Sequence, residues 1–428
     1  MRSGAAILAV LVSFGLSGEP TSFGQPKPKD ESVKFQVGPV VGTVADPTGQ
    51  PSVGTKVLLL AGKRGVPPEV LQQTTTDARG RFQFKQQEYE FVRGTESLGV
   101  FAEDAQGRIG GDSRVSFGSG PSTQEVHFGL RDVKDYQGRL VDAGGKPIAK
   151  ARIELMAWRG DGERSMESFP FSPERIRQSS GESAEDGSFT LRGVPGVGSL
   201  VGMITAEGFG SVYVSFTLAK PVTISLQRPG ALRGSVVPEG KGGSTAGVTL
   251  YLHSYSDARS SAGSDCRVYY YEELTPNEHG EFRVKSLPPG KYMLTAHLRS
   301  DSPYVVEKSS IVEIRSGEEA SLSVPLKRAL ALQGKVVDKR TRKGVQGVSV
   351  YFYTADNSGR QTWGKTATTD EQGAFTAFVK PGKLRARLSR VPEGYLLPSP
   401  RVEPEPVEVT KDMTCPTMEL ESTAVVEG

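Results

Sequence analysis

The chain has 428 residues, and its 52 lysines and arginines nearly balance 49 aspartates and glutamates, for a formal net charge of +3. Interspersed charges in nearly equal number exclude an electrostatic preference for nucleic acid or for an anionic membrane surface. Glycine (51) and proline (28) are frequent, which indicates a folded chain with many turns. The length allows two to four domains, each large enough to bury a core.

The N-terminus has the pattern of a secretory signal peptide, predicted here as residues 1–24. Arg2 precedes an apolar run over residues 5–16, and small residues at Ser17 and Gly24 offer two cleavage points. The run is shorter than the ~20 residues that a membrane-spanning helix needs. A buried strand or an uncleaved anchor is the alternative. We therefore expect an exported chain, periplasmic, on the cell surface or secreted, with no membrane span after cleavage.

Residues 25–36 are polar and contain prolines, which is typical of an extended linker. The sequence has only two cysteines, Cys266 and Cys415. Two cysteines in different predicted domains do not make a disulfide framework. We expect free or buried thiols, with a single bond between neighbouring domains as the alternative.

A repeat runs through the rest of the chain. Four segments share the pattern apolar-x-Gly-x-apolar, and their central glycines recur about every hundred residues, a period that predicts tandem copies of one unit. These glycines are Gly42, Gly138, Gly234 and Gly334. An alternating apolar strand follows in each copy, and then a turn with glycine two residues before phenylalanine. The turns are Gly80/Phe82, Gly187/Phe189, Gly280/Phe282 and Gly373/Phe375.

Apolar alternation with period two and closely spaced turns predict an all-β sandwich in each copy. We interpret the first glycine of each copy as a close backbone approach or a bulge in an edge strand. The turn glycine is expected to have positive φ, with the side chain of Asp77, Asn277 or Asp370 closing the turn. These residues are therefore scaffold rather than ligands.

The closing strands of the copies and the starts of the next copies are separated by short, equal joints, which predict an ordered and elongated tandem array. The predicted units are residues 37–132, 133–228, 229–328 and 329–421, with a tail at 422–428.

Three segments carry a family resemblance: Val41-Gly42-Thr43-Val44-Ala45-Asp46, Gly138-Arg139-Leu140-Val141-Asp142 and Leu287-Pro288-Pro289-Gly290-Lys291-Tyr292. Together with the turns, this pattern resembles the carboxypeptidase regulatory-like domains of transthyretin-like fold. The resemblance implies four tandem Greek-key β-sandwich domains of that type. It also implies an accessory or adhesive role, although fold alone does not give function.

The fourth unit is also similar to Cna-B type pilin and adhesin domains through Val391-Pro392-Glu393-Gly394-Tyr395. Those domains can form a Lys–Asn isopeptide bond that needs a buried glutamate just upstream. The corresponding segment, residues 387–390, contains no carboxylate, so we do not predict the crosslink.

The sequence offers little catalytic chemistry. Its four histidines, His127, His253, His279 and His297, belong to no motif that would bring three zinc ligands together. No nucleophile elbow and no phosphate-binding loop appear. We therefore expect no enzymatic activity, no cofactor and no metal site.

Aromatic residues in two insertions are the candidates for ligand binding. The insertion of the third unit contains Tyr269 and Tyr271, which alternation would place on one exposed face of a strand. The insertion of the second unit, residues 158–185, contains Trp158 and an Arg-Gly-Asp tripeptide at residues 159–161 that coincides with a known adhesion signal. The alternative is that these aromatic side chains pack inside the sandwiches.

The sequence thus predicts an exported, non-enzymatic structural or interaction protein. It would present tandem β-sandwiches, above all the two insertions, to a protein or glycan partner at the cell envelope. The alternative is a carbohydrate-binding protein that uses Trp158, Tyr269 and Tyr271.

Overall fold

In the computed structural model, the regular elements of the described residues are almost all β-strands, which confirms the predicted all-β fold. It describes residues 32–63, 67–92, 95–115, 122–160, 168–240, 243–255, 266–355, 361–397 and 405–423. The predicted signal peptide lies outside these ranges. Over the described residues the only helix is α1 (Pro173–Ser179), and no helix is long and apolar enough to cross a membrane.

The strands form pairs of facing sheets, and the first two pairs come from the N-terminal half of the chain. In the first sandwich, the sheet β5-β2-β9 faces β4-β3-β7-β8, and β1 pairs with β6 in a separate sheet. The bounds are β1 (Ser32–Val37), β2 (Val40–Ala45), β3 (Lys56–Lys63), β4 (Glu69–Thr75), β5 (Arg81–Phe84), β6 (Gln87–Val92), β7 (Thr95–Glu103), β8 (Ile109–Val115) and β9 (Gln124–Gly129). In the second sandwich, β14-β10-β17 faces β12-β11-β15-β16-β20, and β13 also pairs with β11. These bounds are β10 (Val133–Asp142), β11 (Arg152–Arg159), β12 (Ser168–Pro170), β13 (Gly181–Glu182), β14 (Ser188–Pro195), β15 (Ser199–Ala206), β16 (Gly210–Thr217), β17 (Val222–Leu226) and β20 (Cys266–Tyr269).

The C-terminal half forms the third and fourth sandwiches. In the third, β22-β18-β26-β24 faces β21-β19-β23-β25. Its bounds are β18 (Gly230–Pro238), β19 (Val248–Ser254), β21 (Tyr271–Leu274), β22 (Glu281–Leu287), β23 (Gly290–Leu298), β24 (Tyr304–Val305), β25 (Ser310–Ile314) and β26 (Glu319–Arg328). In the fourth, β30-β27-β33, with β34 also on β27, faces β29-β28-β31-β32. These bounds are β27 (Leu330–Asp338), β28 (Ser349–Ala355), β29 (Gln361–Thr368), β30 (Ala374–Val379), β31 (Gly382–Arg390), β32 (Val407–Val409), β33 (Met413–Thr414) and β34 (Met418–Leu420).

The four sandwiches share one topology. In each, the opening strand pairs in parallel with the closing strand: β2 with β9, β10 with β17, β18 with β26, and β27 with β33 and β34. A parallel neighbour cannot be reached by a hairpin, so the chain must cross to the facing sheet and return between these two strands. The predicted closing strands are therefore confirmed, and they sit beside the predicted opening strands.

The predicted close backbone approach is found at two of the repeated glycines, at Gly42 beside the Val126 carbonyl oxygen and at Gly234 beside that of Leu322, but not in edge strands. The four glycines lie in β2, β10, β18 and β27, which are flanked on both sides, so the edge-strand interpretation was wrong. The antiparallel register pairs each glycine with the turn phenylalanine of its copy: Gly42 with Phe82, Gly138 with Phe189, Gly234 with Phe282 and Gly334 with Phe375. A Cβ at any of these glycines would overlap that phenylalanine ring. The glycine therefore makes room for a buried cross-strand ring.

The predicted turns are confirmed. The turn glycine of each copy has positive φ, for example 70° at Gly80 and 71° at Gly373. The Asp77 carboxylate accepts hydrogen bonds from the backbone N–H groups of Arg79 and Arg81. These bonds hold the pKa of Asp77 below its ordinary value. Asn277 makes the same two bonds in the third sandwich.

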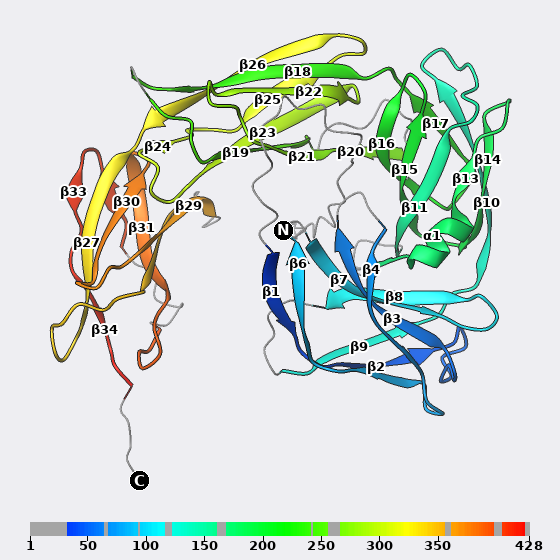
Figure 1. Cartoon of the computed structure of the whole chain (residues 1–428), viewed down its shortest axis with the longest axis horizontal. Coiled ribbons are helices and arrows are strands. Elements are labelled where there is room, and N and C mark those ends of the chain that lie inside the picture. The colour runs from blue at the N-terminus through cyan, green and yellow to red at the C-terminus, as the bar shows by residue number, and fades with distance from the viewer. Residues whose placement is uncertain are drawn as a thin grey trace, which may run out of the picture.

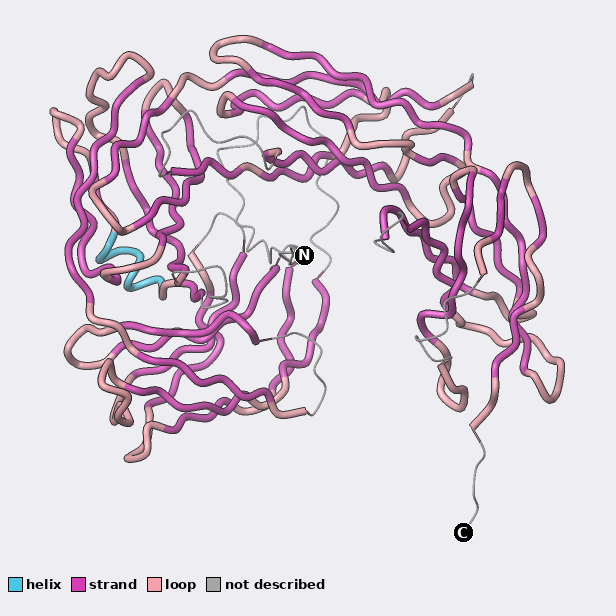
Figure 2. Tube along the Cα trace, turned by 180° about the vertical axis from the view of Figure 1, so that it is seen from behind, coloured by secondary structure: helices cyan, strands magenta, loops and turns pink. Residues whose placement is uncertain are grey.

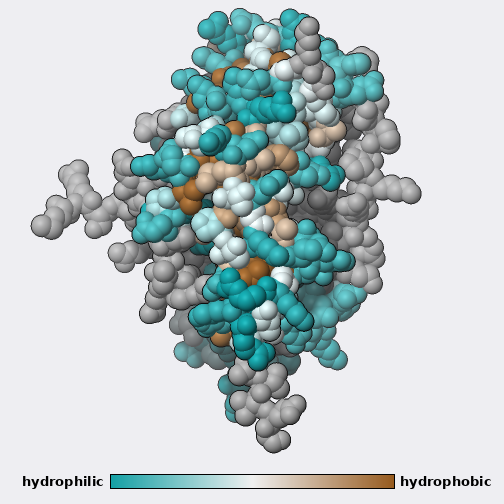
Figure 3. All heavy atoms as spheres, turned by 90° about the vertical axis from the view of Figure 1, so that its left-hand side faces the viewer, coloured by the Kyte–Doolittle hydropathy of each residue, from teal (hydrophilic) through white to brown (hydrophobic). Residues whose placement is uncertain are grey.

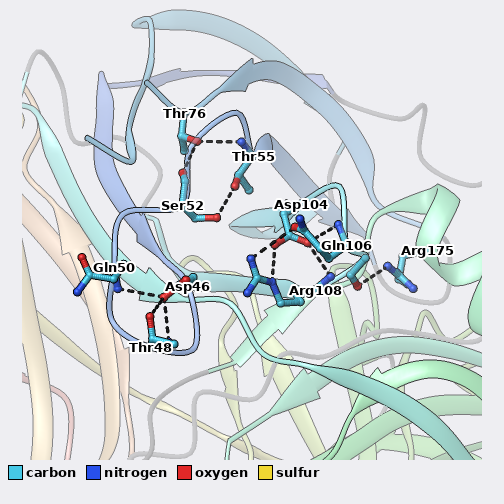
Figure 4. Close-up of polar contacts among 11 residues, drawn as sticks. Asp46, Thr48, Gln50, Ser52, Thr55, Thr76, Asp104, Gln106, Arg108 and Arg175 are labelled. Atoms are coloured by element: carbon cyan, nitrogen blue, oxygen red, sulfur yellow. Dashed lines mark hydrogen bonds and ion pairs between the residues drawn. The ribbon is translucent and has the colours of Figure 1, made fainter. Parts of the chain in front are cut away.

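The same side-chain cap also closes the turns that begin at Asp46 and Asp104. Figure 4 shows Asp46 accepting from the N–H groups of Thr48 and Gln50, and Asp104 accepting from Gln106 and Arg108. An aspartate that accepts from the residues two and four positions later replaces bonds that the turning backbone cannot make by itself. This local chemistry fixes where each strand pair reverses.

The sandwiches follow one another along an open arch. In Figure 1 the second and fourth sandwiches form the two sides, the third lies across the top and the first lies below the second; Figure 2 shows the same arch from behind. In each sandwich the sheet that contains β3, β11, β19 or β28 lies toward the inside of the arch. The expected ordered tandem array is thus curved rather than straight.

Candidate functional site

Trp158, the first predicted ligand residue, is part of the core. Its side chain is only 1% exposed, and its indole Nε1 donates a hydrogen bond to the carbonyl oxygen of Val197 over 2.7 Å. The Phe169 ring lies 5.1 Å from the indole, and the guanidinium of Arg131 lies 4.5 Å from its centre. The indole therefore has no open face on which a sugar could stack, and the exposure on which its prediction depended is not found.

The insertion that follows Trp158 packs against the first sandwich. Its strand β12 lies beside β7 and β8, and the rings of Phe169 and Phe171 lie 6.1 and 6.5 Å from Phe101 of β7. All three rings are almost fully buried in one hydrophobic cluster, which spans both sandwiches and also contains Leu58 and Ile109. This cluster is the joint between the first and second sandwiches.

Two glycines of the first sandwich allow this close packing. A Cβ on Gly99 would lie 2.8 Å from Cδ of Pro170, and one on Gly111 would lie 2.7 Å from Cβ of Phe169. Both distances are shorter than a carbon–carbon contact, so neither position accepts a larger residue without moving β12. Unexplained glycines inside two strands are the signal by which the sequence could have indicated this joint.

The helix α1 adds polar contacts to the same joint. Ser172 caps its N-terminus by accepting from the N–H of Arg175 over 3.1 Å, and proline follows at the first helical position. The Arg175 guanidinium is buried, pairs with Glu103 of β7 and donates to the carbonyl oxygen of Gly107. Burial raises the pKa of Glu103, although Arg175 opposes that shift. Figure 4 shows Arg175 reaching toward the turn at Asp104.

The insertion of the third unit also reaches back to the sandwich before it. Its strand β20 pairs antiparallel with β16 and so becomes a strand of the second sandwich, with Cys266 opposite Phe216 and Tyr269 opposite Tyr213. Cys266 is 2% exposed, and burial raises the pKa of its thiol to about 12. A protonated, enclosed thiol is a packing group rather than a nucleophile.

Tyr269 and Tyr271 do not share a face of one strand. Tyr269 ends β20, whereas Tyr271 begins β21, which belongs to the third sandwich. Tyr270 lies between them with its ring 5.6 Å from that of Tyr292, and its hydroxyl donates to Glu272. Its backbone N–H donates to Ser254 Oγ over 2.6 Å. The chain therefore changes sandwich at Tyr270.

Tyr271 points away from the core of the third sandwich. It lies opposite His253 on β19, where Leu250 and Leu252 are fully buried and the residues between them face outward. The rings of Tyr271 and Tyr251 are 5.8 Å apart, and the His297 ring lies 4.7 Å from Tyr251. This aromatic group lines the inside of the arch.

Two lysines of the fourth sandwich bridge to the third. Lys365 Nζ donates to the carbonyl oxygen of Ser302 over 3.4 Å, and Lys380 Nζ donates to that of Glu307 over 2.9 Å. The two carbonyls flank β24, which lies at the edge of its sheet. Burial lowers the pKa of both lysines. This joint is held by polar contacts and uses no insertion.

The predicted role of the two insertions therefore needs correction. Their described parts do not extend toward an external partner; they fill the joints with the preceding sandwich. Arg159 of the Arg-Gly-Asp tripeptide belongs to β11, and Asp161 lies outside the described residues.

Groups that could carry chemistry are dispersed. Over the described ranges, no three His, Cys, Asp or Glu side chains lie close enough together to hold a metal ion. Cys266 and Cys415 are both buried thiols without a disulfide bond, as expected.

A shallow depression of about 550 Å³ lies beside β27 and β30, lined in part by Lys335, Asp370 and Thr376. Figure 3 looks at this side of the molecule, where pale and brown surface runs down the middle between hydrophilic residues.

Comparisons with known proteins give distant likenesses only. Neither family models nor curated proteins match the chain. Among solved structures, a streptococcal ancillary pilin has a TM-score of 0.27 and 16% identity over 68% of this chain and 100% of the pilin. The Bacillus anthracis TIE protein has a TM-score of 0.21 and 13% identity over 94% and 76%, and the minor pilin GBS52 of Streptococcus agalactiae 0.25 and 16% over 46% and 98%. Similarity of this size carries no argument about function.

Proposed function

We propose that the chain is an exported, non-enzymatic structural protein that presents four joined sandwiches to a protein or glycan partner at the cell envelope. The observation that carries this proposal is the use of both insertions as joints. Phe169 and Phe171 pack on the first sandwich, and β20 completes a sheet of the second. Because the insertions hold neighbouring sandwiches in fixed relative positions, they support a function that depends on how the surfaces of the sandwiches are arranged in space.

We also propose that the four sandwiches are four domains, bounded at residues 37–132, 133–228, 229–328 and 329–421, with β20 of the third segment completing a sheet of the second domain. The gaps between closing and opening strands support these limits, because β9 ends at Gly129 and β10 begins at Val133. The transthyretin-like type of the domains is part of the same proposal, and the shared parallel pairing of opening and closing strands supports it.

Export is tested by fractionating cells that produce the chain with a C-terminal tag. We expect the tagged protein in the envelope or the medium, with an intact mass that corresponds to a start at Gly18 or Gln25. A matched control carries Leu11→Arg, which places a charge in the apolar run and should retain the chain inside the cell. Uncleaved wild-type protein in the cytosol would overturn the proposal.

Carbohydrate binding is the second candidate, and the pair of Tyr251 and Tyr271 favours it. Aromatic rings on an exposed sheet face pack against the C–H faces of sugars. Retention on insoluble polysaccharides should fall in Tyr271→Ala. Tyr269→Ala serves as the matched variant on β20, where the partly buried tyrosine packs against the second core. Equal retention of wild type and Tyr271→Ala would exclude this site.

A further inference from the structure

The inner face of the fourth sandwich carries two stacked tyrosines on β28. Val350 and Phe352 of this strand are fully buried, so alternation places Tyr351 and Tyr353 on the opposite face. Their ring centres are 5.7 Å apart and the ring planes are only 15° from parallel. A Cβ on Gly364 of β29 would overlap the phenol group of Tyr351, so this ring lies across the sheet. The sheet that contains β28 lies toward the inside of the arch (Figure 1).

A row of three cations runs beside these rings on β31. Lys383, Arg385 and Arg387 occupy alternate positions, and Leu384 between the first two is buried, so all three side chains belong to the tyrosine face. The register places Arg387 opposite Tyr351 and Arg385 opposite Tyr353. Alternate residues of a strand are about 6.5–7 Å apart. The strand therefore places three cationic side chains on this face at regular intervals.

Arg387 is held by both rings. Its guanidinium carbon lies 5.4 Å from the centre of each tyrosine ring, and the residue is exposed. Cation–π contacts fix the plane of a guanidinium while its N–H groups stay available at the edge. The side chain therefore loses less conformational freedom when it binds an anion.

Among the described residues in register with this face, the acidic one is Glu408 of β32, which lies opposite Lys383 at one end of the row and offsets its charge. Beside the tyrosines, the register of β29 places Gly364 opposite Tyr353 and Thr366 opposite Tyr351, and neither residue is acidic. An anionic partner is thus the one that this face complements.

We propose that this face binds an acidic polysaccharide through its carboxylate groups. A guanidinium forms paired hydrogen bonds with a carboxylate, and an aromatic ring packs on the C–H face of a sugar. Tyr353 is only 8% exposed and helps to position Arg387, whereas Tyr351 is half-buried, so one uronate residue could use Arg387 and the Tyr351 ring together. Strands β28 and β31 are flanked on both sides, so their backbone groups are already paired and cannot bind an extended peptide by strand addition. This favours a polysaccharide over an acidic peptide. This proposal rests on the proposed function above in one respect: an exported protein can meet polysaccharides outside the cell.

The test measures binding of the full mature chain to soluble polygalacturonate, with dextran as the neutral polymer and poly-glutamate as the acidic peptide. We expect binding to polygalacturonate that weakens between about 50 and 500 mM salt. Arg387→Gln should weaken it by about tenfold or more, as expected for loss of a charge-assisted hydrogen bond. Lys335→Gln removes the same charge from the opposite sheet of this sandwich and should leave binding unchanged.

Arg387→Lys tests whether the planar guanidinium is needed, because lysine keeps the positive charge but has no guanidinium. This variant should bind polygalacturonate more weakly than the wild type. No binding of polygalacturonate would overturn the proposal. So would equal loss in Lys335→Gln, or equal binding of dextran or poly-glutamate. Export of the chain is measured separately, so failure here leaves the proposed presenting role intact.

Discussion

At the scale of single residues, the fold depends on the pairing of a glycine with a phenylalanine across two strands. The four pairs have the same register although the number of residues between the partners differs from copy to copy. Both residues recur in every copy of the repeat, and the alternation of apolar residues around them predicts that both lie in strands that face the core. Their contact depends on pairing between distant strands, which no local pattern reports.

Gly42→Ala should destabilise the first sandwich. Its Cβ would overlap the Val126 carbonyl oxygen and come within 2.7 Å of the Phe82 ring, and overpacking of this kind costs about 1–3 kcal/mol. Gly129→Ala is the matched control in the neighbouring strand, where the nearest atom would be 4.0 Å from the Cβ, and it should change stability by less than about 0.5 kcal/mol. Urea unfolding compares them, and equal effects would contradict the proposed contact.

The turn at Asp77 should contribute to stability in a pH-dependent way. Backbone N–H groups of Arg81 and Arg79 lower the pKa of its carboxyl from 3.8. A lowered folded-state pKa gives stability that is present above pH ~4 and is lost as the pH falls through the folded value. Asp77→Asn keeps the acceptor oxygen, as Asn277 does in the third sandwich. This variant should therefore lose less folding stability than the wild type as the pH falls below about 4. An unchanged pH dependence of the urea midpoint would refute the assignment.

At the scale of elements, the sequence was informative wherever a pattern is local. Alternation predicted the opening and closing strands, and aspartate with glycine predicted the turns, because each is decided by neighbouring residues. The sequence did not predict which sandwich β12 and β20 pack against, because the position of an insertion depends on contacts between residues far apart in the chain. The short helix α1 was also missed, because seven residues are too few for an apolar period to emerge.

The joint between the first two sandwiches should depend on the small size of Gly99. Gly99→Ala places a methyl group against Pro170 and should displace β12, which would increase hydrogen exchange of its amides. Pro170→Ala removes the ring atoms that the new methyl group meets, so the double variant should recover part of the protection. Additive losses in the double variant would argue against a direct contact.

At the scale of the whole molecule, the sandwiches do not have separate cores throughout. One cluster contains Leu60 and Phe101 of the first sandwich together with Trp158 of the second and Cys266 of the third unit. The first, third and fourth sandwiches also have clusters of their own, and the third and fourth meet through the Lys365 and Lys380 contacts. Because part of the first sandwich is buried in the cluster of the second, we expect these two to unfold in one calorimetric transition; two separate transitions for them would contradict coupling through that cluster.

The central claim is that the joints hold the four sandwiches in one arrangement. Pulsed electron–electron double resonance measures the distance between two spin labels and so tests this directly. One label is attached at Val53→Cys in the first sandwich, where the residue is 62% exposed, and the other at Arg340→Cys, which is exposed in the fourth. The buried thiols Cys266 and Cys415 stay in place, and the chain without added cysteines is the labelling control. The joined arch requires a single narrow distance distribution that broadens in Gly99→Ala. A broad distribution in the wild-type background would contradict it.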